Sequence, residues 1–402
     1  MRRAGYLTER IAETDNLLEA WYKAARGKGM MAETLRFGAS LEAEVARLRA
    51  AVLSGHVEVG DYTYFRIHDP KPRLICAAAF RERVLHHALM NVCHPYFERQ
   101  LIETTYATRP GKGIYQALDR TRRALRHYGY VAKFDFRKYF DSIDHAILKG
   151  KLRRLFKDGR LLGIFDDIID SYSRSAGRGL PIGNLTSQYF ANCYLSGLDH
   201  YVKEELRAGE YVRYMDDFLL FASGRGELER LVGGVERFVA DELNLALKPV
   251  VFLTSSEGVP FLGYTVFPHK VRLNGRSKRR LKTRMREYEC RRARGEWGER
   301  DYMEHITPLL AFAGYGYTKS LRRGILGEWQ RTQRLQPRES RRQLEQQCEE
   351  LPGVELEQQH PGQPQQQYRV PGCAASLSLV QETDVHVVNR PLSCLPLSCK
   401  RR

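Results

Sequence analysis

The chain has 402 residues, of which 43% are hydrophobic, enough for a sizeable core and two or three domains. Its formal net charge of +17 favours a polyanionic partner, with nucleic acid ahead of an anionic membrane surface. No run approaches the roughly 18 apolar residues of a membrane span, and the first residues lack the apolar core of a signal peptide. The eight cysteines form no CxxC pair or metal-ligand cluster. We therefore expect a soluble cytoplasmic protein with reduced thiols.

Apolar residues at helical spacing predict helices within residues 10–56: Leu17, Leu18, Trp21, Tyr22, Leu41, Val45, Leu48 and Val52. Residues 57–80 change to short extended pieces broken by glycine and proline, and a helix follows over residues 80–97. The basic loop at 107–113, ATRPGKG, leads into a helix at 114–128. Such loops often contact phosphate, although this one matches no nucleotide-binding signature.

Residues 130–136, YVAKFDF, alternate like a half-buried strand that ends at Asp135, and RKYFDSIDH at 137–145 opens the next helix. The loop at 177–188, GRGLPIGNLTSQ, runs into another helix. In YVRYMDDFLLF, residues 211–221, two apolar runs flank Asp216 and Asp217, which predicts a tight turn between two strands. A helix at 228–239 and strands at 245–253 and 261–267 complete the pattern.

This order of elements predicts an α+β fold with helices on one face of a mostly antiparallel sheet, in which Asp135 lies beside the Asp216–Asp217 turn. Singly, these aspartates are consistent with an ordinary acidic turn and a helix cap. Three clustered carboxylates repel one another unless cations bind them. Two Mg²⁺ ions about 4 Å apart would serve nucleotide transfer to a 3′-hydroxyl. In so basic a chain, the combination favours the metal site.

With these motifs the chain resembles the reverse transcriptases over roughly residues 57–320. Tyr214-Met215-Asp216-Asp217 matches the YxDD box, and Phe134-Asp135 with Tyr139-Phe140 matches the first catalytic motif. The resemblance implies a right-hand polymerase fold with fingers, palm and helical thumb, preceded by N-terminal helices. It also implies that Asp135 and Asp216 bind two Mg²⁺ ions, replaceable by Mn²⁺, that the Phe136 carbonyl assists, and that Asp217 completes the catalytic group.

The resemblance also assigns residues to the substrates. Phe140 matches the bulky gate that excludes a ribose 2′-hydroxyl, so dNTPs are expected rather than rNTPs. The residues that would bind the dNTP are Lys71, Arg73, Phe140, Ile182, Gly183, Gln188 and Lys248. Those that would contact template and primer are Tyr214, Met215, Phe261, Gly263, Arg279, Arg280 and Lys282. The ordinary alternatives are a core role for Phe140 and solvated charges for Lys71 and Lys248.

The loop from Ile182 to Gln188, IGNLTSQ, departs from most reverse transcriptases, which have glutamine where Ile182 stands and a serine-proline further on. Because an aliphatic side chain cannot hydrogen-bond near the nascent base pair, we expect reduced fidelity. This pattern and residues 71–89, KPRLICAAAFRERVLHHAL, resemble the reverse transcriptases of diversity-generating retroelements. Those enzymes copy a template-repeat RNA into cDNA with errors at adenines. The implied partners are template RNA, cDNA or primer, dNTPs and a small basic accessory protein, in a bacterial or phage-encoded system.

Residues 276–330 are basic and helical, with an apolar stripe of Leu281, Met285 and Tyr288, as in a thumb that follows the template–primer backbone. After about residue 335, glutamine and proline predominate, which predicts disorder. With a suitable choice of codons, a shift of one base turns residues 341–375 into asparagine-rich repeats, so we hypothesise a template repeat read out of frame. The predicted domains are an N-terminal helical extension (1–56), fingers and palm (57–272), a thumb (273–334) and a tail (335–402).

Three functions fit these observations. The first is the error-prone RNA-directed DNA polymerase of a diversity-generating retroelement. The second is a group II intron or retron-type reverse transcriptase, against which no maturase or endonuclease domain is expected after the thumb, and the retron NAxxH and VTG segments are not found. The third is a non-catalytic RNA-binding protein on a polymerase scaffold. The three aspartates argue against that last function, because an inert scaffold needs no cluster of mutually repelling carboxylates.

Overall fold

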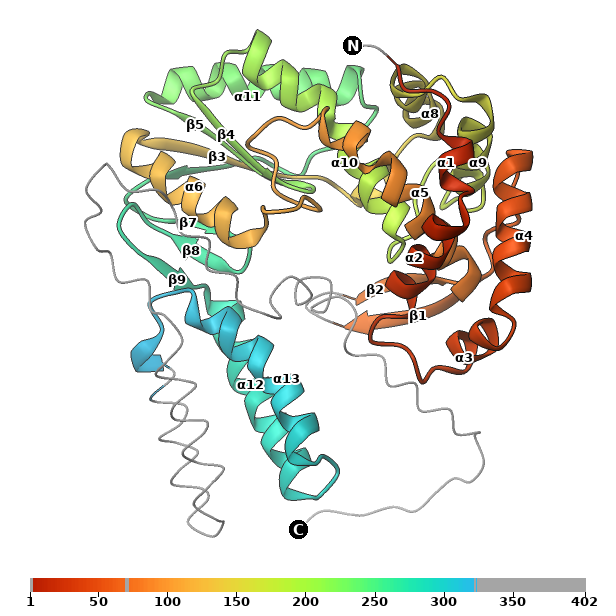
Figure 1. Ribbon diagram of the computed structural model, residues 1–402. Helices are drawn as coiled ribbons and strands as arrows, with labels where there is room; N and C mark the ends of the chain where they lie inside the picture. Colours follow the sequence, from red (N-terminus) through yellow and green to blue (C-terminus); the bar gives the residue numbers. More distant parts are fainter. Residues whose placement is uncertain (1–2, 69–71, 322, 324–402) are drawn as a thin grey trace, which may run out of the picture. The chain divides into compact units, whose positions relative to one another are not determined.

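The computed structural model describes residues 3–68, 72–321 and 323; Lys71 and the predicted tail lie outside them. The helices, drawn in Figure 1, are α1 (Thr8–Ile11), α2 (Thr14–Ala25), α3 (Ala32–Ala39), α4 (Leu41–Ser54), α5 (Phe80–Glu98), α6 (Ile114–His127), α7 (Tyr139–Ser142), α8 (His145–Leu155), α9 (Gly159–Asp170), α10 (Leu185–His200), the π-helical turn η1 (Tyr201–Glu205), α11 (Arg225–Asp241), α12 (Gly275–Ala293) and α13 (Glu299–Gly314). The strands are β1 (Tyr62–His68), β2 (Pro72–Ala78), β3 (Tyr130–Asp135), β4 (Glu210–Tyr214), β5 (Asp217–Ala222), β6 (Val251–Thr254), β7 (Val259–Phe261), β8 (Tyr264–Val266) and β9 (Val271–Leu273).

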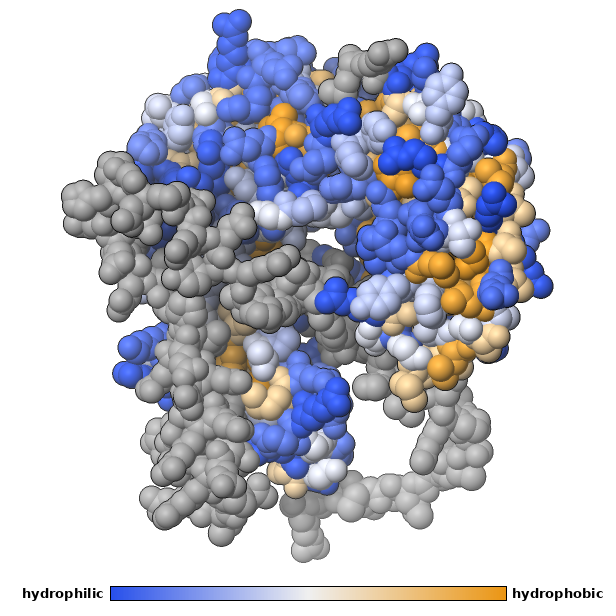
Figure 2. Space-filling model, in the orientation of Figure 1, coloured by the Kyte–Doolittle hydropathy of each residue, from blue (hydrophilic) through white to orange (hydrophobic). Residues whose placement is uncertain are grey.

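The N-terminal region is helical, as predicted, and it joins the main core. Helix α2 packs against α5 and α4, and Leu17 of α2 is fully buried among their apolar residues. Asp158, the N-cap of α9, accepts hydrogen bonds from the backbone N–H groups of Leu7 (2.8 Å) and Thr8 (3.0 Å). Figure 2 shows a mostly hydrophilic face with apolar residues gathered over the N-terminal helices. The next segment forms the antiparallel hairpin β1–β2.

The central sheet has the order β4-β5-β3-β6 and is antiparallel throughout. Its side chains alternate between two apolar clusters. Phe134, Phe218 and Leu220 face α10 and α11, whereas Val131 and Leu219 face α6. Helices therefore cover both faces, and the prediction that they cover one face is wrong. The physical reason is that both the odd-numbered and the even-numbered residues of these strands are mostly apolar. Both faces of the sheet are therefore apolar, and each must be covered.

Three predicted elements differ in detail. The predicted helix after Asp135 is short, because α7 ends at Ser142 and α8 begins anew at the N-cap Asp144, whose side chain accepts from the N–H groups of Ala146 and Ile147. The predicted strand 245–253 is regular only over β6. The predicted strand 261–267 is a hairpin, β7–β8, whose turn residues Leu262 and Gly263 have φ of 48° and 88°. Strand β9 joins it to form a three-stranded sheet.

Helices α12 and α13 pack against each other and against the β7–β8–β9 sheet. The predicted stripe of Leu281, Met285 and Tyr288 is the buried face of α12, as expected for a helix whose basic residues face outward. The helices are confirmed, and their role as a thumb stays a prediction. Among the described residues, none of the helices has an apolar stretch long enough to cross a membrane.

Candidate active site

The turn between β4 and β5 consists of Met215 and Asp216, with Tyr214 paired to Asp217 across it. Met215 has φ of +55°, a left-handed conformation that is uncommon for a residue other than glycine. Such conformations persist where the surroundings hold them in place and are frequent at functional sites. The predicted tight turn is therefore confirmed, and its backbone is strained at the residue before the first aspartate.

Asp135, the last residue of β3, lies directly opposite Asp217, the first residue of β5. Directly opposed residues in an antiparallel pair point to the same face, and like charges in that arrangement are destabilising. The sheet thus brings together the two segments that the sequence predicted to meet. Burial raises the pKa of Asp216, which is next to Asp217 in the turn, and the negative charge of Asp135 adds to that rise.

Two lysines lie against these carboxylates. The Nζ atom of Lys133 is 3.1 Å from both side-chain oxygens of Asp217, and the side chain of Lys248 pairs with that of Asp135. The Lys248 backbone N–H also donates to the Asp135 carbonyl at 2.9 Å. Lys248 was predicted to bind the dNTP, whereas Lys133 was missed. A signal was available, because residues 133 and 135 of an alternating strand share one face.

The pKa values of two of these carboxylates, Asp216 and Asp217, are raised. Burial raises the pKa of Asp217 to about 6, even though Lys133 lowers it, and Asp216 and Asp135 add to the rise. Burial also raises the pKa of Asp216. The hydrogen bond from its own backbone N–H opposes that rise, as do the charges of Arg73 and Lys248. Burial, more than the surrounding charges, therefore accounts for the raised pKa values of Asp216 and Asp217.

The donor set fits a divalent metal ion in its chemistry. Carboxylate oxygens are the ligands that Mg²⁺ prefers, and Oδ1 of Asp217 is buried without a hydrogen-bond partner, although the Lys133 ammonium lies close to it. Within residues 3–68, 72–321 and 323, no three His, Cys, Asp or Glu side chains are arranged to hold a metal ion. Metal binding by Asp135, Asp216 and Asp217 therefore stays a prediction.

The assisting carbonyl predicted at Phe136 also stays a prediction. The Phe136 side chain is buried, and its segment pairs with Leu247 in an isolated antiparallel bridge. The hydrogen bonds of that bridge involve the neighbours of Phe136, since Arg137 N–H donates to Ala246 and Asp135 accepts from Lys248. The bridge thus fixes the backbone on both sides of the predicted ligand.

Two of the predicted dNTP residues, Arg73 and Phe140, lie on β2 and α7. Arg73 is exposed on β2, and its positive charge opposes the rise that burial causes in the pKa of Asp216, so it acts on the site from the β1–β2 hairpin. Phe140 is half-buried against Tyr139, with ring centroids 5.5 Å apart.

The predicted fidelity loop is docked on the same hairpin. The carbonyl of Ile182 accepts from the Cys76 N–H of β2 at 2.9 Å. Gly183 has φ of +119° and lies so close to β2 that an added Cβ would be 3.0 Å from Ile75. The side chain of Gln188 accepts from the Thr108 hydroxyl at 3.1 Å. The loop therefore connects β2 to the start of α10.

The predicted template–primer residues differ in accessibility. Phe261 is buried, with Lys133 Nζ 5.7 Å from its ring centroid, and Lys133 also donates to the Pro260 carbonyl at 2.9 Å. A Cβ at Gly263 would lie 2.9 Å from Phe312 of α13. The other predicted template–primer residues have half-buried or exposed side chains: Tyr214, Met215, Arg279, Arg280 and Lys282. Phe261 and Gly263 therefore support the hairpin from within and do not offer side chains to a ligand.

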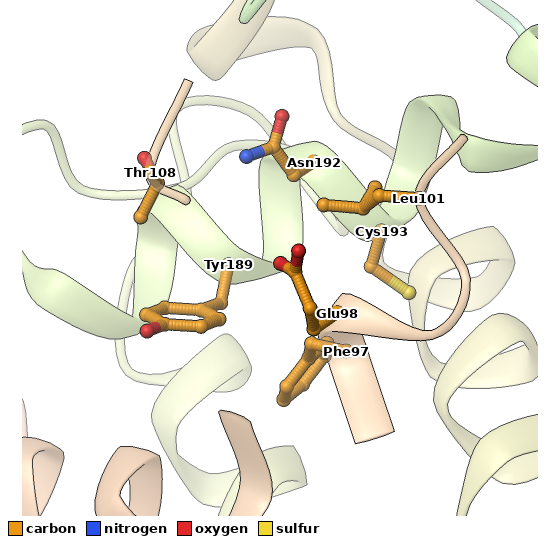
Figure 3. Close-up of a pocket in the computed structure, with 7 residues that line it drawn as sticks. All are labelled: Phe97, Glu98, Leu101, Thr108, Tyr189, Asn192 and Cys193. Atoms are coloured by element: carbon orange, nitrogen blue, oxygen red, sulfur yellow. The ribbon is translucent and has the colours of Figure 1, made fainter. Parts of the chain in front are cut away.

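The basic loop at 107–113 is tied to the protein. Arg109 donates to Glu98 at 2.8 Å and to the Thr105 carbonyl at 2.8 Å, and its side chain is buried. Arg109 therefore holds this loop against the end of α5. A small cavity beside this loop lies between the end of α5 and α10, as Figure 3 shows. It is lined by Phe97, Glu98, Leu101, Thr108, Tyr189, Asn192 and Cys193. None of these lining residues is one of the three aspartates, so this cavity is separate from the candidate active site.

Comparison with known proteins agrees with this geometry. Residues 67–266 match the family described as reverse transcriptase (RNA-dependent DNA polymerase). Relatives include protein YkfC of Escherichia coli (strain K12), 24% identical over 230 residues, covering 46% of this chain and 60% of that protein. Another is the group II intron-encoded protein LtrA of Lactococcus lactis subsp. cremoris, 23% identical over 139 residues, covering 33% and 23%. The chain thus spans no more than about three fifths of either relative.

Among solved structures, apo telomerase from Candida tropicalis aligns with a TM-score of 0.43 and 11% identity, covering 69% of this chain and 58% of that one. The family match and the mixed helix–sheet architecture define a polymerase domain. Residues 67–266 form a reverse transcriptase domain, the domain of RNA-directed DNA polymerases. Enzymes of this family generally use divalent metal ions.

Proposed function

We propose that the chain is an RNA-directed DNA polymerase that extends a primer with dNTPs on an RNA template, using Asp135, Asp216 and Asp217. The observation that carries this proposal is the direct opposition of Asp135 and Asp217 beside a strained turn, inside a reverse transcriptase domain. A scaffold without catalysis would have no reason to oppose two carboxylates, because the arrangement is destabilising by itself.

The reaction is phosphoryl transfer, in which the primer 3′-oxygen attacks the dNTP α-phosphate and pyrophosphate leaves. Catalysis therefore consists of positioning and charge neutralisation. Divalent ions held by the three aspartates, Mg²⁺ in the proposal and Mn²⁺ as a substitute, would supply Lewis-acid neutralisation. Arg73 would bind the triphosphate from β2, with Lys71 beside it in sequence but outside the described residues. Phe140 would exclude the ribose 2′-hydroxyl.

We further propose that the enzyme is the error-prone polymerase of a diversity-generating retroelement, misincorporating at template adenines. Support comes from Ile182, whose side chain has no hydrogen-bonding group and whose backbone fastens the loop to β2. Template-repeat RNA and a small basic accessory protein would be its partners, and the cytoplasm its location. The proposed out-of-frame template repeat at 341–375 lies outside the described residues, and stop codons in the shifted frame of the gene would refute it.

A group II intron-type reverse transcriptase is the second candidate. It is favoured by the similarity to a group II intron-encoded protein and to nuclear intron maturase 1 of Arabidopsis thaliana, 25% identical over 87 residues. That match covers 22% of this chain and 12% of the plant protein. The two candidates share their chemistry and differ in template and fidelity.

Primer extension on an RNA template with dNTPs and Mg²⁺ tests the proposals. We expect the parent to extend the primer and Asp216→Asn to lose almost all activity; no extension by the parent, or equal extension by both, refutes the polymerase. Sequencing the products separates the candidates. Errors concentrated at template adenines support the retroelement enzyme, and uniform fidelity across the four bases favours the intron type.

A further inference from the structure

Directly behind the catalytic turn lies a fully buried ion pair. Arg213 of β4 and Asp199 of α10 both have 0% exposed side chains. Arg213 Nε donates to Oδ1 of Asp199 at 2.7 Å, and its Nη2 donates to Oδ2 at 2.5 Å, so the pair is bidentate. The Nη1 atom donates to Oδ1 of Asn192 at 3.0 Å. The guanidinium is thus held from two positions on one helix.

The partners of the pair are themselves fixed. Asp199 accepts further hydrogen bonds from the Tyr211 hydroxyl at 2.8 Å and the Thr105 hydroxyl at 3.1 Å. Removing two charges from water costs several kcal/mol per ion, and apolar residues of similar volume would often be as stable or more so. Stability alone therefore does not account for this pair.

The pair reaches the turn through one hydrogen bond. Arg213 Nη1 also donates to the Met215 carbonyl at 2.9 Å. Because a peptide group is planar, fixing this carbonyl fixes the N–H of Asp216 at the other end of the same plane. The Cα atom of Asp216 belongs to the same plane, so the orientation of the plane sets the direction from which the Asp216 side chain starts. The left-handed φ of Met215 also needs a partner to hold it.

We propose that Arg213, clamped by Asp199 and Asn192, is a positioning residue that sets the orientation of the Met215–Asp216 peptide and hence of the Asp216 carboxylate. The inference rests on the proposed polymerase function. Arginine is required because its planar fork binds Asp199 with two donors and still has the two N–H groups of Nη1, which donate to Asn192 and to the Met215 carbonyl. A lysine has one compact ammonium and cannot span these acceptors.

The test compares Arg213→Lys with Arg120→Lys. Arg120 of α6 donates to Glu210, the first residue of β4, at the end of that strand remote from the turn. Its replacement is therefore a control for the loss of an ion pair that holds β4 without contacting the turn. For Arg213→Lys we expect kcat to fall about 100-fold, the scale of a 1 Å misplacement, with KM for dNTP little changed. Hydrogen exchange of the Tyr214–Phe218 segment should become faster, and Arg120→Lys should change neither kcat nor this exchange.

The outcomes separate this inference from the proposed function. If the parent polymerises and Arg213→Lys matches Arg120→Lys in both kcat and turn exchange, the positioning role is refuted. If the parent does not polymerise, the proposed function fails, and faster exchange of the turn in Arg213→Lys still supports the positioning role. Should Arg213→Lys not fold, Asn192→Ala removes one of the two acceptors of Nη1, together with the hydrogen bond that Asn192 donates to the Ala107 carbonyl. We then expect a smaller change in the same direction, and no change refutes the inference.

Discussion

Replacing Asp217 with asparagine is expected to stabilise the metal-free protein while abolishing its polymerase activity. The carboxylate of Asp217 has 28% exposure and a pKa raised from 3.8 to about 6, first by burial and then by Asp216 and Asp135. The folded protein therefore binds a proton at Asp217 more tightly than the unfolded chain does. Ionisation of Asp217 at neutral pH lowers stability, and asparagine removes that ionisation.

The size and the pH range of the effect follow from the same values. At about 1.4 kcal/mol for each factor of ten, the raised pKa corresponds to about 3 kcal/mol at neutral pH. This is an upper limit, because Lys133 loses a charged partner. The gain in stability of Asp217→Asn over the parent should be almost absent below about pH 4, where Asp217 is mostly protonated in both the folded and the unfolded protein. It should be complete above about pH 6–7. The parent protein thus loses stability as the pH rises through the pKa that Asp217 has in the folded state.

The difference in stability between Asp217→Asn and the parent can be measured by thermal unfolding of both proteins between pH 4 and 8, with a chelator present. We expect a rise in Tm of a few degrees at pH 7.5 that shrinks toward pH 4. Added Mg²⁺ should raise the Tm of the parent more than that of the variant. Asp170→Asn is the control, because Asp170 has 58% exposure and its ion pair with Lys149 contributes little. A lower Tm at pH 7.5, or a gain that does not depend on pH, contradicts the electrostatic argument.

Three further changes test other parts of the structure. Phe140→Val should raise rNTP incorporation relative to dNTP by about 10- to 100-fold in kcat/KM, because the smaller side chain admits the 2′-hydroxyl. Phe218→Ala should lower the free energy of unfolding by about 3–5 kcal/mol in urea titrations, since this buried ring stacks on Phe134 with centroids 4.5 Å apart. Asp158→Ala should lower it by about 1–2 kcal/mol at pH 7. Burial raises the pKa of Asp158, but hydrogen bonds from Thr8 and others outweigh this and lower it, so that loss should fade below about pH 4.

Much of the fold could be predicted because its signals are local. The helices α5 and α6 have the expected bounds within a few residues, and the β4–β5 hairpin follows from two apolar runs around two aspartates. The covering of both sheet faces could not be assigned in this way, because an apolar strand does not show which helix packs on which side. The segment 245–250 alternates like a strand, yet only Leu247 forms a bridge there, since its partner Phe136 already lies beyond the end of β3.

The candidate site, like the fold, could be predicted only where its signals are local in the sequence. The meeting of Asp135 with the turn was predictable from the order of elements, and the register between β3 and β5 confirms it. Lys133 could have been found from strand alternation, because it shares a face with Asp135 and lies diagonal to Asp217.

Arg213 and Asp199 could not be paired from the sequence, because they lie in a strand and a helix whose packing depends on the whole core. An arginine within the apolar run YVRYM nevertheless contradicts the pattern of a buried strand, and a buried charge requires a partner. The exception to the apolar pattern therefore marks the residue that reaches the turn. Because the proposed chemistry depends on orienting carboxylates, such an exception next to the proposed catalytic turn is a stronger indication of function than the apolar residues around it.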